Sequence, residues 1–250
     1  MQKCVIKGKP IDGQEKLIAV SIMGKNLMEI EKEMNNLMFL KPDIIEWRCD
    51  YFEQLLNMTQ LIDAAIFIRE HTQHTPLIFT CRNQREGGRA SINNSDYYRI
   101  IDNMVDLGVP DCIDMEISLN SQLIEKVRKK ISNQNIQLIM SYHNFQKTPP
   151  IEELMNVIKQ GLIQGGTLIK IATMINDYQD LYQLQSLNFY NDVLKNIPKI
   201  IIGMGEMGQI TRIYPEVFGS CITFASNVNL SAPGQLSIRD LKEIWQITEK

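Results

Sequence analysis

The stretch TLIKIATM, residues 167–174, has the composition of a β-strand that is buried on both faces. Leu168, Ile169 and Ile171 favour a protein interior, but Lys170 lies among them. An ammonium group buried without a partner costs several kcal/mol, so lysine is seldom found in such a place. Lys170 therefore either reaches solvent with the end of its side chain or has a chemical use.

Similar short apolar runs recur along the chain and alternate with segments of helical periodicity. The seven further runs are residues 17–23, 43–47, 77–81, 112–117, 137–142, 199–204 and 221–225. Between the first two, Leu27, Ile30, Met34 and Leu37 have the spacing of one helix face. Eight strand–helix units predict an α/β fold, a closed (β/α)8 TIM barrel with a parallel sheet.

The first sixteen residues do not follow this alternation. VIKGKPIDGQ, residues 5–14, contains Lys-Pro and Asp-Gly turn signals and predicts a β-hairpin that closes the amino-terminal end of the barrel. No linker or internal repeat interrupts the rest, so we expect residues 1–250 to form one domain. Three helix ends are also predicted: Thr148 as an N-cap before Pro149, Gly108 just after a helix, and Ser237 with Asp240 as a capping box.

Composition restricts the classes of partner. The formal net charge is −3 with no basic excess, which argues against binding to nucleic acid or to an anionic membrane surface. Five widely spaced cysteines suggest neither a disulfide framework nor a zinc site, and no apolar run reaches eighteen residues. We expect a reduced, cytoplasmic protein whose partner is a small molecule.

Polar residues gather where the predicted strands end, which is the catalytic face of this kind of barrel. In chain order the first six strands supply Ser21, then Glu46 and Arg48, then Arg82 with Glu86 just beyond, then Asp114 and Glu116, then Ser141 and His143, and finally Lys170. Residues two apart share a face of a strand, so these side chains are expected to point toward the barrel axis. Such convergence of charged groups predicts a functional site, although some members would belong to a supporting ion-pair network.

Within that site Lys170 is predicted to act as a nucleophile. Burial near Arg48 and Arg82 would disfavour its ammonium form, and a neutral amine attacks carbonyl groups to form a Schiff base. The alternative is a structural lysine whose charge is held by Glu46 or Glu116. The convergence of the other polar residues favours the chemical use.

His143 is predicted to be the general acid and base, because an imidazole can take and return a proton near neutral pH. Glu86 is a plausible partner to fix its tautomer. His71 and His74 have a spacing of three that would suit a metal ion, but no acidic or cysteine co-ligand accompanies them. We interpret them as a helix end before Pro76.

Two later segments complete the predicted mouth. Arg212 suits the capture of a carboxylate, and NLSAPGQ, residues 229–235, offers hydrogen-bonding groups on a loop; we predict residues 227–236 as a lid. GMGEMG, residues 203–208, matches a dinucleotide fingerprint. It lies late in the chain and no acidic residue ends the next strand, so we expect its glycines to let the backbone approach a ligand or to turn tightly below Arg212.

These residues together give the sequence a close resemblance to the type I 3-dehydroquinate dehydratases, the Schiff-base dehydroquinases of the shikimate pathway. It is carried by EWR at 46–48, DMEI at 114–117, LIMSYHN at 138–144, KIATM at 170–174, FGSCITF at 218–224 and SAPGQ at 231–235. Gly203, Thr211 and Ser226 depart from the expected serine, serine and glycine.

The resemblance implies a hydro-lyase that converts 3-dehydroquinate to 3-dehydroshikimate without a metal or an organic cofactor, and it implies a homodimer. Lys170 would form the imine, His143 would act as acid and base, and Glu86 would orient it. The implied substrate contacts are Arg212 for the carboxylate, Ser21, Glu46, Arg48, Arg82, Ser231 and Gln235 for the hydroxyls and the ketone, and Met204 and Phe224 as an apolar wall. A Schiff-base aldolase and a non-catalytic carboxylate-binding barrel are the alternatives.

Overall fold

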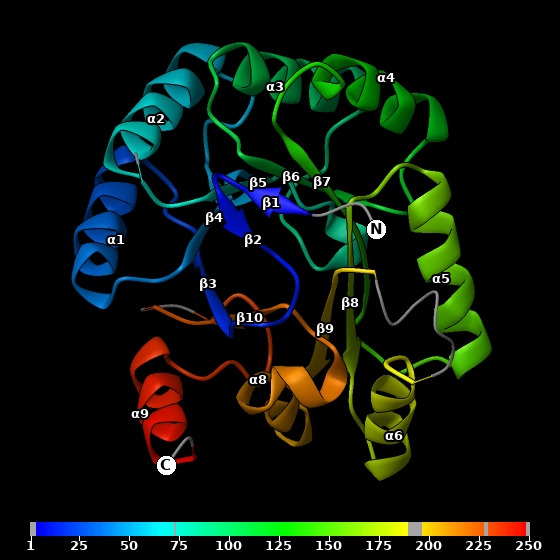
Figure 1. Ribbon diagram of the computed structural model, residues 1–250. Coiled ribbons are helices and arrows are strands. Elements are labelled where there is room, and N and C mark those ends of the chain that lie inside the picture. The colour runs from blue at the N-terminus through cyan, green and yellow to red at the C-terminus, as the bar shows by residue number, and fades with distance from the viewer. Residues whose placement is uncertain (1–3, 73, 190–196, 228–229, 249–250) are drawn as a thin grey trace.

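The computed structural model describes residues 4–72, 74–189, 197–227 and 230–248. Eight parallel strands form one sheet in the order β10-β3-β4-β5-β6-β7-β8-β9, and the helices surround it (Figure 1). The strands are β3 (Leu17–Ile22), β4 (Ile44–Arg48), β5 (Leu77–Thr80), β6 (Cys112–Glu116), β7 (Gln137–Asn144), β8 (Leu168–Met174), β9 (Lys199–Met204) and β10 (Ile222–Ala225). All eight predicted strands are confirmed.

The two end strands of this order, β10 and β9, contact each other and close the sheet into a barrel. The Cys221 N–H donates to the Lys199 carbonyl at 2.7 Å, and the Ser220 hydroxyl accepts from the Ile201 N–H at 2.9 Å. The predicted TIM barrel is therefore confirmed, with its seam joined at the beginnings of β9 and β10.

The helices follow the strands as the periodicity predicted. Their bounds are α1 (Leu27–Leu40), α2 (Met58–His71), α3 (Asn94–Asp106), α4 (Ser121–Ile131), α5 (Ile151–Ile163), α6 (Tyr178–Ser186), α8 (Ile210–Ile213) and α9 (Ile238–Thr248). Short 3-10 turns lie at η1 (Cys49–Tyr51), η2 (Gln84–Glu86), η3 (Met207–Gln209) and η4 (Pro215–Phe218). In α1 the buried residues are Ile30, Met34 and Leu37, which form one stripe facing the sheet.

Alternation along the strands separates two apolar cores. Ile45, Trp47, Ile169 and Ile171 face outward and pack with the helices, as expected. A second cluster fills the barrel interior with the first inward side chains of the strands, including Leu17. All five cysteines are buried free thiols.

The predicted hairpin is present as β1 (Val5–Ile6) and β2 (Lys9–Pro10), which lie across one end of the barrel (Figure 1). The Ile6 side chain belongs to the interior cluster. The turn, however, lies at Lys7 and Gly8, whose φ angles are 49° and 79°. This left-handed pair suits a two-residue hairpin. The Asp-Gly signal corresponds to a bend just after β2, where Gly13 has a φ of 77° and Asp12 accepts the Gln14 N–H at 3.0 Å, whereas Lys9 and Pro10 form β2 itself.

Two of the three predicted helix ends hold. Gly108 follows α3 with φ 66°, and Ser237 accepts from the Asp240 N–H at 3.1 Å before α9. Thr148 is not an N-cap, because α5 begins after Pro150 and the Thr148 hydroxyl instead bonds Thr173 and the Met174 carbonyl. Within the described residues, no helix has both the length and the apolar character that a membrane crossing requires.

Candidate active site

A cavity opens where the barrel strands end, and eleven of the twelve predicted site residues line it. These are Glu46, Arg48, Arg82, Glu86, His143, Lys170, Met204, Arg212, Phe224, Ser231 and Gln235. The cavity holds about 480 Å³ of space, its open mouth included. Ser21 does not line it; the Ser21 hydroxyl donates to Glu46 at 2.5 Å and lies 3.5 Å from the Ser231 hydroxyl. Ser21 therefore supports the wall from behind.

Lys170 is buried on β8 with its amine between two carboxylates. Its Nζ lies 3.1 Å from Asp114 Oδ2 and 3.7 Å from Glu46 Oε1, and 4.3 Å from the centre of the Phe224 ring. The expected proximity to Arg48 and Arg82 is found in the shared cavity wall, but the oxygens in contact with Nζ belong to carboxylates. Arg48 pairs with Asp50, whereas Arg82 shares the Asp114 carboxylate with Lys170.

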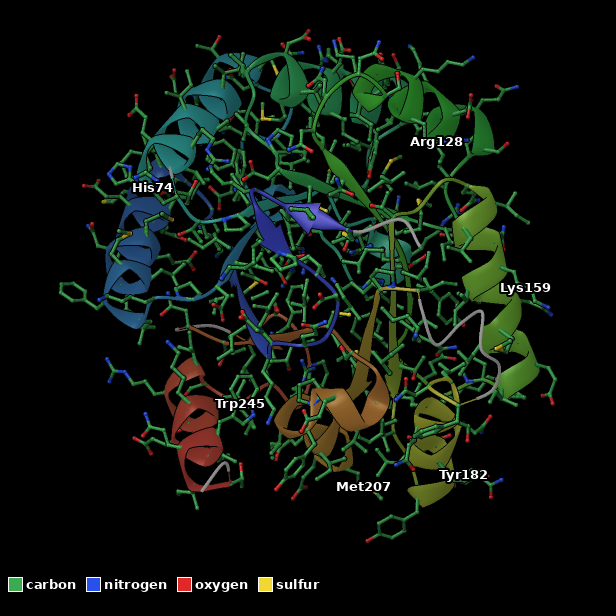
Figure 2. The ribbon with its side chains drawn as sticks, viewed as in Figure 1. His74, Arg128, Lys159, Tyr182, Met207 and Trp245 are labelled. Carbon is green, nitrogen blue, oxygen red and sulfur yellow. The ribbon has the colours of Figure 1, made fainter. Side chains whose placement is uncertain are left out.

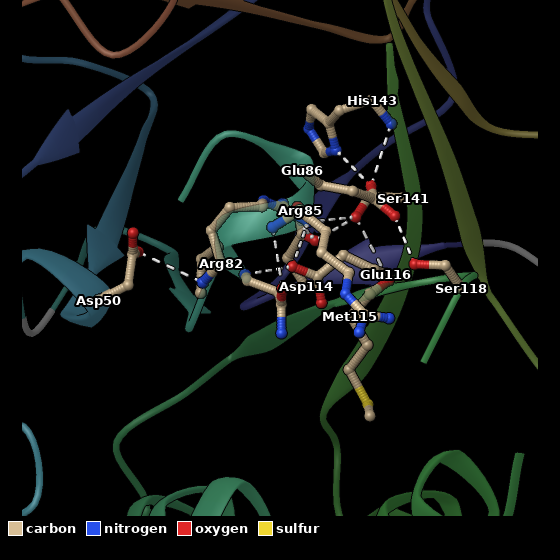
Figure 3. A network of polar contacts seen from close by, with 12 residues as sticks. Asp50, Arg82, Arg85, Glu86, Asp114, Met115, Glu116, Ser118, Ser141 and His143 are labelled. Atoms are coloured by element: carbon tan, nitrogen blue, oxygen red, sulfur yellow. Dashed lines mark hydrogen bonds and ion pairs between the residues drawn. The ribbon is translucent and has the colours of Figure 1, made fainter. Parts of the chain in front are cut away.

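Asp114 is the centre of this pairing, and the predicted site residues did not include it. Arg82 contacts Asp114 at 2.7 Å and Glu116 at 3.1 Å, and the Ser141 hydroxyl donates to Asp114 at 2.6 Å (Figure 3). Burial alone would raise the pKa of the Asp114 carboxyl, but Arg82 and Lys170 outweigh burial and hold it below its usual range. The spacing of Asp114 and Glu116 on β6 predicts that both point into the barrel, but it gives Asp114 neither a role nor a partner.

Glu86 and His143 form a buried pair above this network (Figure 3). Glu86 Oε2 lies 3.1 Å from His143 Nδ1 and accepts the His143 backbone N–H at 3.1 Å, while Glu86 Oε1 accepts the Ser118 hydroxyl at 2.5 Å. The carboxylate thus holds the imidazole by two points, as the predicted pairing requires. With Glu86 ionised, the proton belongs on Nδ1, and Nε2 remains free to act as a base.

The electrostatics of the pair suit proton transfer. Burial lowers the pKa of His143 well below its ordinary value, and the positive charges of Arg82 and Lys170 lower it further. His143 is therefore neutral at pH 7. Burial raises the pKa of Glu86 to about 7, against the opposing effects of Ser118 and Arg82.

Arg212, on α8, is a buried cation that no carboxylate of the described residues pairs with. Its Nη1 donates to the Phe224 carbonyl at 3.1 Å, its Nη2 lies 3.5 Å from the Pro233 carbonyl, and its Nε is buried without a partner. Burial lowers the pKa of Arg212 to about 10. An uncompensated guanidinium on the cavity wall favours an anionic ligand.

The loop after β10 lies against the GMGEMG segment. The Ser231 N–H donates to Gln235 Oε1 at 2.7 Å, and Gln235 Nε2 donates to the Ser231 hydroxyl at 2.9 Å. The Gly205 N–H donates to the Pro233 carbonyl at 3.2 Å. A Cβ at Gly208 would lie 2.4 Å from the Gly203 carbonyl group, so the glycines serve a tight turn beneath Arg212. Of the predicted lid 227–236, residues 228 and 229 lie outside the described residues, and its movement stays a prediction.

The other predicted feature, the pair of histidines in REHTQHTP, lies away from the cavity. His71 ends α2 with its Nδ1 2.7 Å from the Phe67 carbonyl, and His74 is exposed at the edge of the molecule (Figure 2). Across the described ranges, no three His, Cys, Asp or Glu side chains are grouped so as to hold a metal ion.

Comparison with known proteins gives this geometry its context. A family model described as type I 3-dehydroquinase matches residues 18–250. A 3-dehydroquinate dehydratase of Geobacillus sp. strain WCH70 is 35% identical over 251 residues, which cover 100% of this chain and 96% of that protein. One from Alkaliphilus oremlandii is 35% identical over 252 residues, covering 99% and 98%.

Solved structures agree. The 3-dehydroquinate dehydratase of Geobacillus kaustophilus superposes with a TM-score of 0.93 at 28% identity, covering 99% of this chain and 96% of that one. A type I enzyme from Clostridium difficile, solved with covalently modified comenic acid, superposes with a TM-score of 0.91 at 31% identity, covering 99% of this chain and 97% of that one.

Proposed function

Since the chain belongs to the type I 3-dehydroquinase family, and is thus a hydro-lyase of the 3-dehydroquinate dehydratase kind, we propose that it removes water from 3-dehydroquinate through an imine on Lys170. The observation that carries the mechanism is the placement of a buried amine and a neutral imidazole on the wall of one cavity. The first supplies a nucleophile and the second a base.

The first step joins the Lys170 nitrogen to the ring ketone carbon. The Lys170 ammonium first gives up one proton, which frees the nitrogen electron pair to attack the ketone carbon. That proton and a second one from the nitrogen then leave with the ketone oxygen as one water, and an iminium remains. The positive charge is unchanged across this step. Asp114 and Glu46, which stabilise the ammonium at 3.1 and 3.7 Å, therefore also stabilise the iminium.

The second step eliminates the hydroxyl. The iminium acidifies the neighbouring C–H bond, and His143 Nε2 takes that proton while the electron pair moves into an enamine. The imidazolium returns the proton to the departing hydroxyl, which leaves as a second water. Hydrolysis of the remaining conjugated iminium consumes one water and restores the Lys170 ammonium, so the net loss is one water. Glu86 stabilises the transient imidazolium.

The remaining wall residues bind the substrate in this proposal. Arg212 receives the carboxylate, for which its lack of a described protein counter-charge is the support. Hydroxyl and ketone oxygens would be bound by Glu46, Arg48, Arg82, Ser231 and Gln235, with Ser21 acting through Glu46, while Met204 and Phe224 form the apolar wall.

The direct test is to incubate the protein with 3-dehydroquinate and follow the ultraviolet absorbance of the conjugated product. We expect turnover by the wild-type protein and nearly none by Lys170→Ala. Binding without absorbance change would support a carboxylate-binding barrel instead, and cleavage of a carbon–carbon bond would support an aldolase. A single domain, a homodimer and a cytoplasmic location stay predictions. Sedimentation tests the homodimer, and cell fractionation tests the location.

A further inference from the structure

Asp50 lies in η1, directly after β4, and all four acceptor positions of its carboxylate are used. Its Oδ1 accepts from Arg48 Nε at 2.8 Å and from the Arg82 backbone N–H at 3.3 Å. Its Oδ2 accepts from Arg48 Nη2 and from the Arg89 backbone N–H, both at 2.9 Å. The side chain is 0% exposed. A carboxylate has about four acceptor positions, so none remains for substrate or water.

On one side Asp50 fixes the orientation of Arg48, which lines the cavity. The paired bonds from Arg48 fix the plane of its guanidinium, because two parallel contacts define an orientation that one does not. The Cζ atom of that guanidinium lies 5.0 Å from the centre of the Tyr51 ring. Within the described ranges nothing accepts from Nη1, and Arg48 lines the cavity. Asp50 thus holds one edge of Arg48 and leaves another for a ligand.

On the other side Asp50 holds both ends of the loop 82–90. The base of this loop is closed by the Ala90 N–H to the Arg82 carbonyl at 3.3 Å and the Gln84 N–H to the Ala90 carbonyl at 2.9 Å. Glu86 lies between these ends and contacts His143 at 3.1 Å. Figure 3 shows the contact from Asp50 to the start of the loop and the contact from Glu86 to His143.

We propose that Asp50 is a positioning residue for the dehydration: one buried carboxylate sets both the direction of Arg48 and the position of the Glu86–His143 pair. This inference rests on the proposed function. A change at Asp50 then alters substrate binding through Arg48 and proton transfer through Glu86, although Asp50 touches no substrate. Misplacement of a catalytic group by about 1 Å costs on the order of 100-fold in rate, which sets the expected size of the effect.

The test uses Asp50→Asn and Asp50→Glu. The amide loses two acceptor positions and presents N–H groups to donors, and the glutamate keeps the charge but moves it by about 1.5 Å. We expect Asp50→Asn to lower kcat about 100-fold and to raise KM about tenfold, with smaller changes in the same direction for Asp50→Glu. Asp111→Asn is the matched control, because Asp111 joins Arg69 to the Leu77 N–H at the opposite end of the barrel.

A double-mutant cycle separates positioning from general stability. If Asp50 acts on proton transfer through Glu86, adding Asp50→Asn to Glu86→Gln lowers kcat by no more than about threefold further, while the KM effect persists. Wild-type kcat and KM in Asp50→Glu, or multiplicative loss of kcat in the double variant, overturns the proposal. Asp50→Glu decides if Asp50→Asn does not fold. Failure of the wild-type protein to turn over 3-dehydroquinate would instead refute the proposed function.

Discussion

Replacement of Arg212 by methionine should separate binding from stability. In the absence of ligand its guanidinium is buried, and its pKa has fallen from 12.5 to about 10. That difference corresponds to a cost of ~3 kcal/mol for the buried charge. The 3.1 Å bond from this charged group returns about 2 kcal/mol and the 3.5 Å contact adds little, so removing Arg212 should stabilise the ligand-free protein by ~1 kcal/mol.

The assay is thermal unfolding beside steady-state kinetics. For a domain of this size ~1 kcal/mol raises the midpoint by about 2–4 °C, and loss of the carboxylate partner should raise KM roughly 30-fold or more. Arg48→Met is the matched control, because it leaves buried Asp50 without its cation and should lower the midpoint by roughly 10 °C. A lower midpoint for Arg212→Met with an unchanged KM would refute the reasoning.

Four further outcomes are expected. Below pH 7 protonation of Glu86 places a proton donor beside Nδ1 of His143 and removes the free base at Nε2. The value of kcat/KM should therefore fall about tenfold per pH unit on the acid side of its pH profile. Glu86→Gln should abolish this acid-side fall, and a fall that persists contradicts the assignment. His143→Ala should still form the imine but turn over at least ~100-fold more slowly, as single-turnover trapping measures. Ile6→Ala should destabilise the barrel by about 2–5 kcal/mol in denaturant titrations with KM unchanged, and an altered KM would argue against a purely structural hairpin. Residues 230–236 should gain protection from amide exchange when ligand binds, and equal exchange in both states counts against a lid.

The barrel was predictable from sequence because its strands are buried on both faces and read as continuous apolar runs. Lys170 interrupts such a run, and its inward direction followed from alternation with Ile169 and Ile171. The start of α5 was not predictable, because Thr148 bonds Thr173 on a neighbouring strand rather than its own helix. Local capping preferences carry no information about such tertiary partners.

The set of site residues and the Glu86–His143 pair were predictable, but the carboxylate partner of Lys170 was not. Because side chains alternate along a strand, Asp114 on β6 and Lys170 on β8 are both expected to point into the barrel, but β7 lies between these two strands in the sheet. Their 3.1 Å contact depends on side-chain reach across the barrel, which a linear sequence does not specify. The role of Asp50 was hidden for the same reason, since two of its four donors are backbone N–H groups of a loop more than thirty residues away.

Reduction of the working enzyme tests the covalent step. The wild-type protein is mixed with 3-dehydroquinate and borohydride, and its peptides are then mapped by mass spectrometry. We predict a stable adduct on the peptide containing Lys170, and no adduct in Lys170→Met. Lys199→Met is the control and should retain the adduct, because Lys199 is also a buried strand lysine but lies at the beginning of β9, at the other end of the barrel. Full turnover by Lys170→Met, or an active wild-type protein that never yields the adduct, would contradict catalysis by this amine.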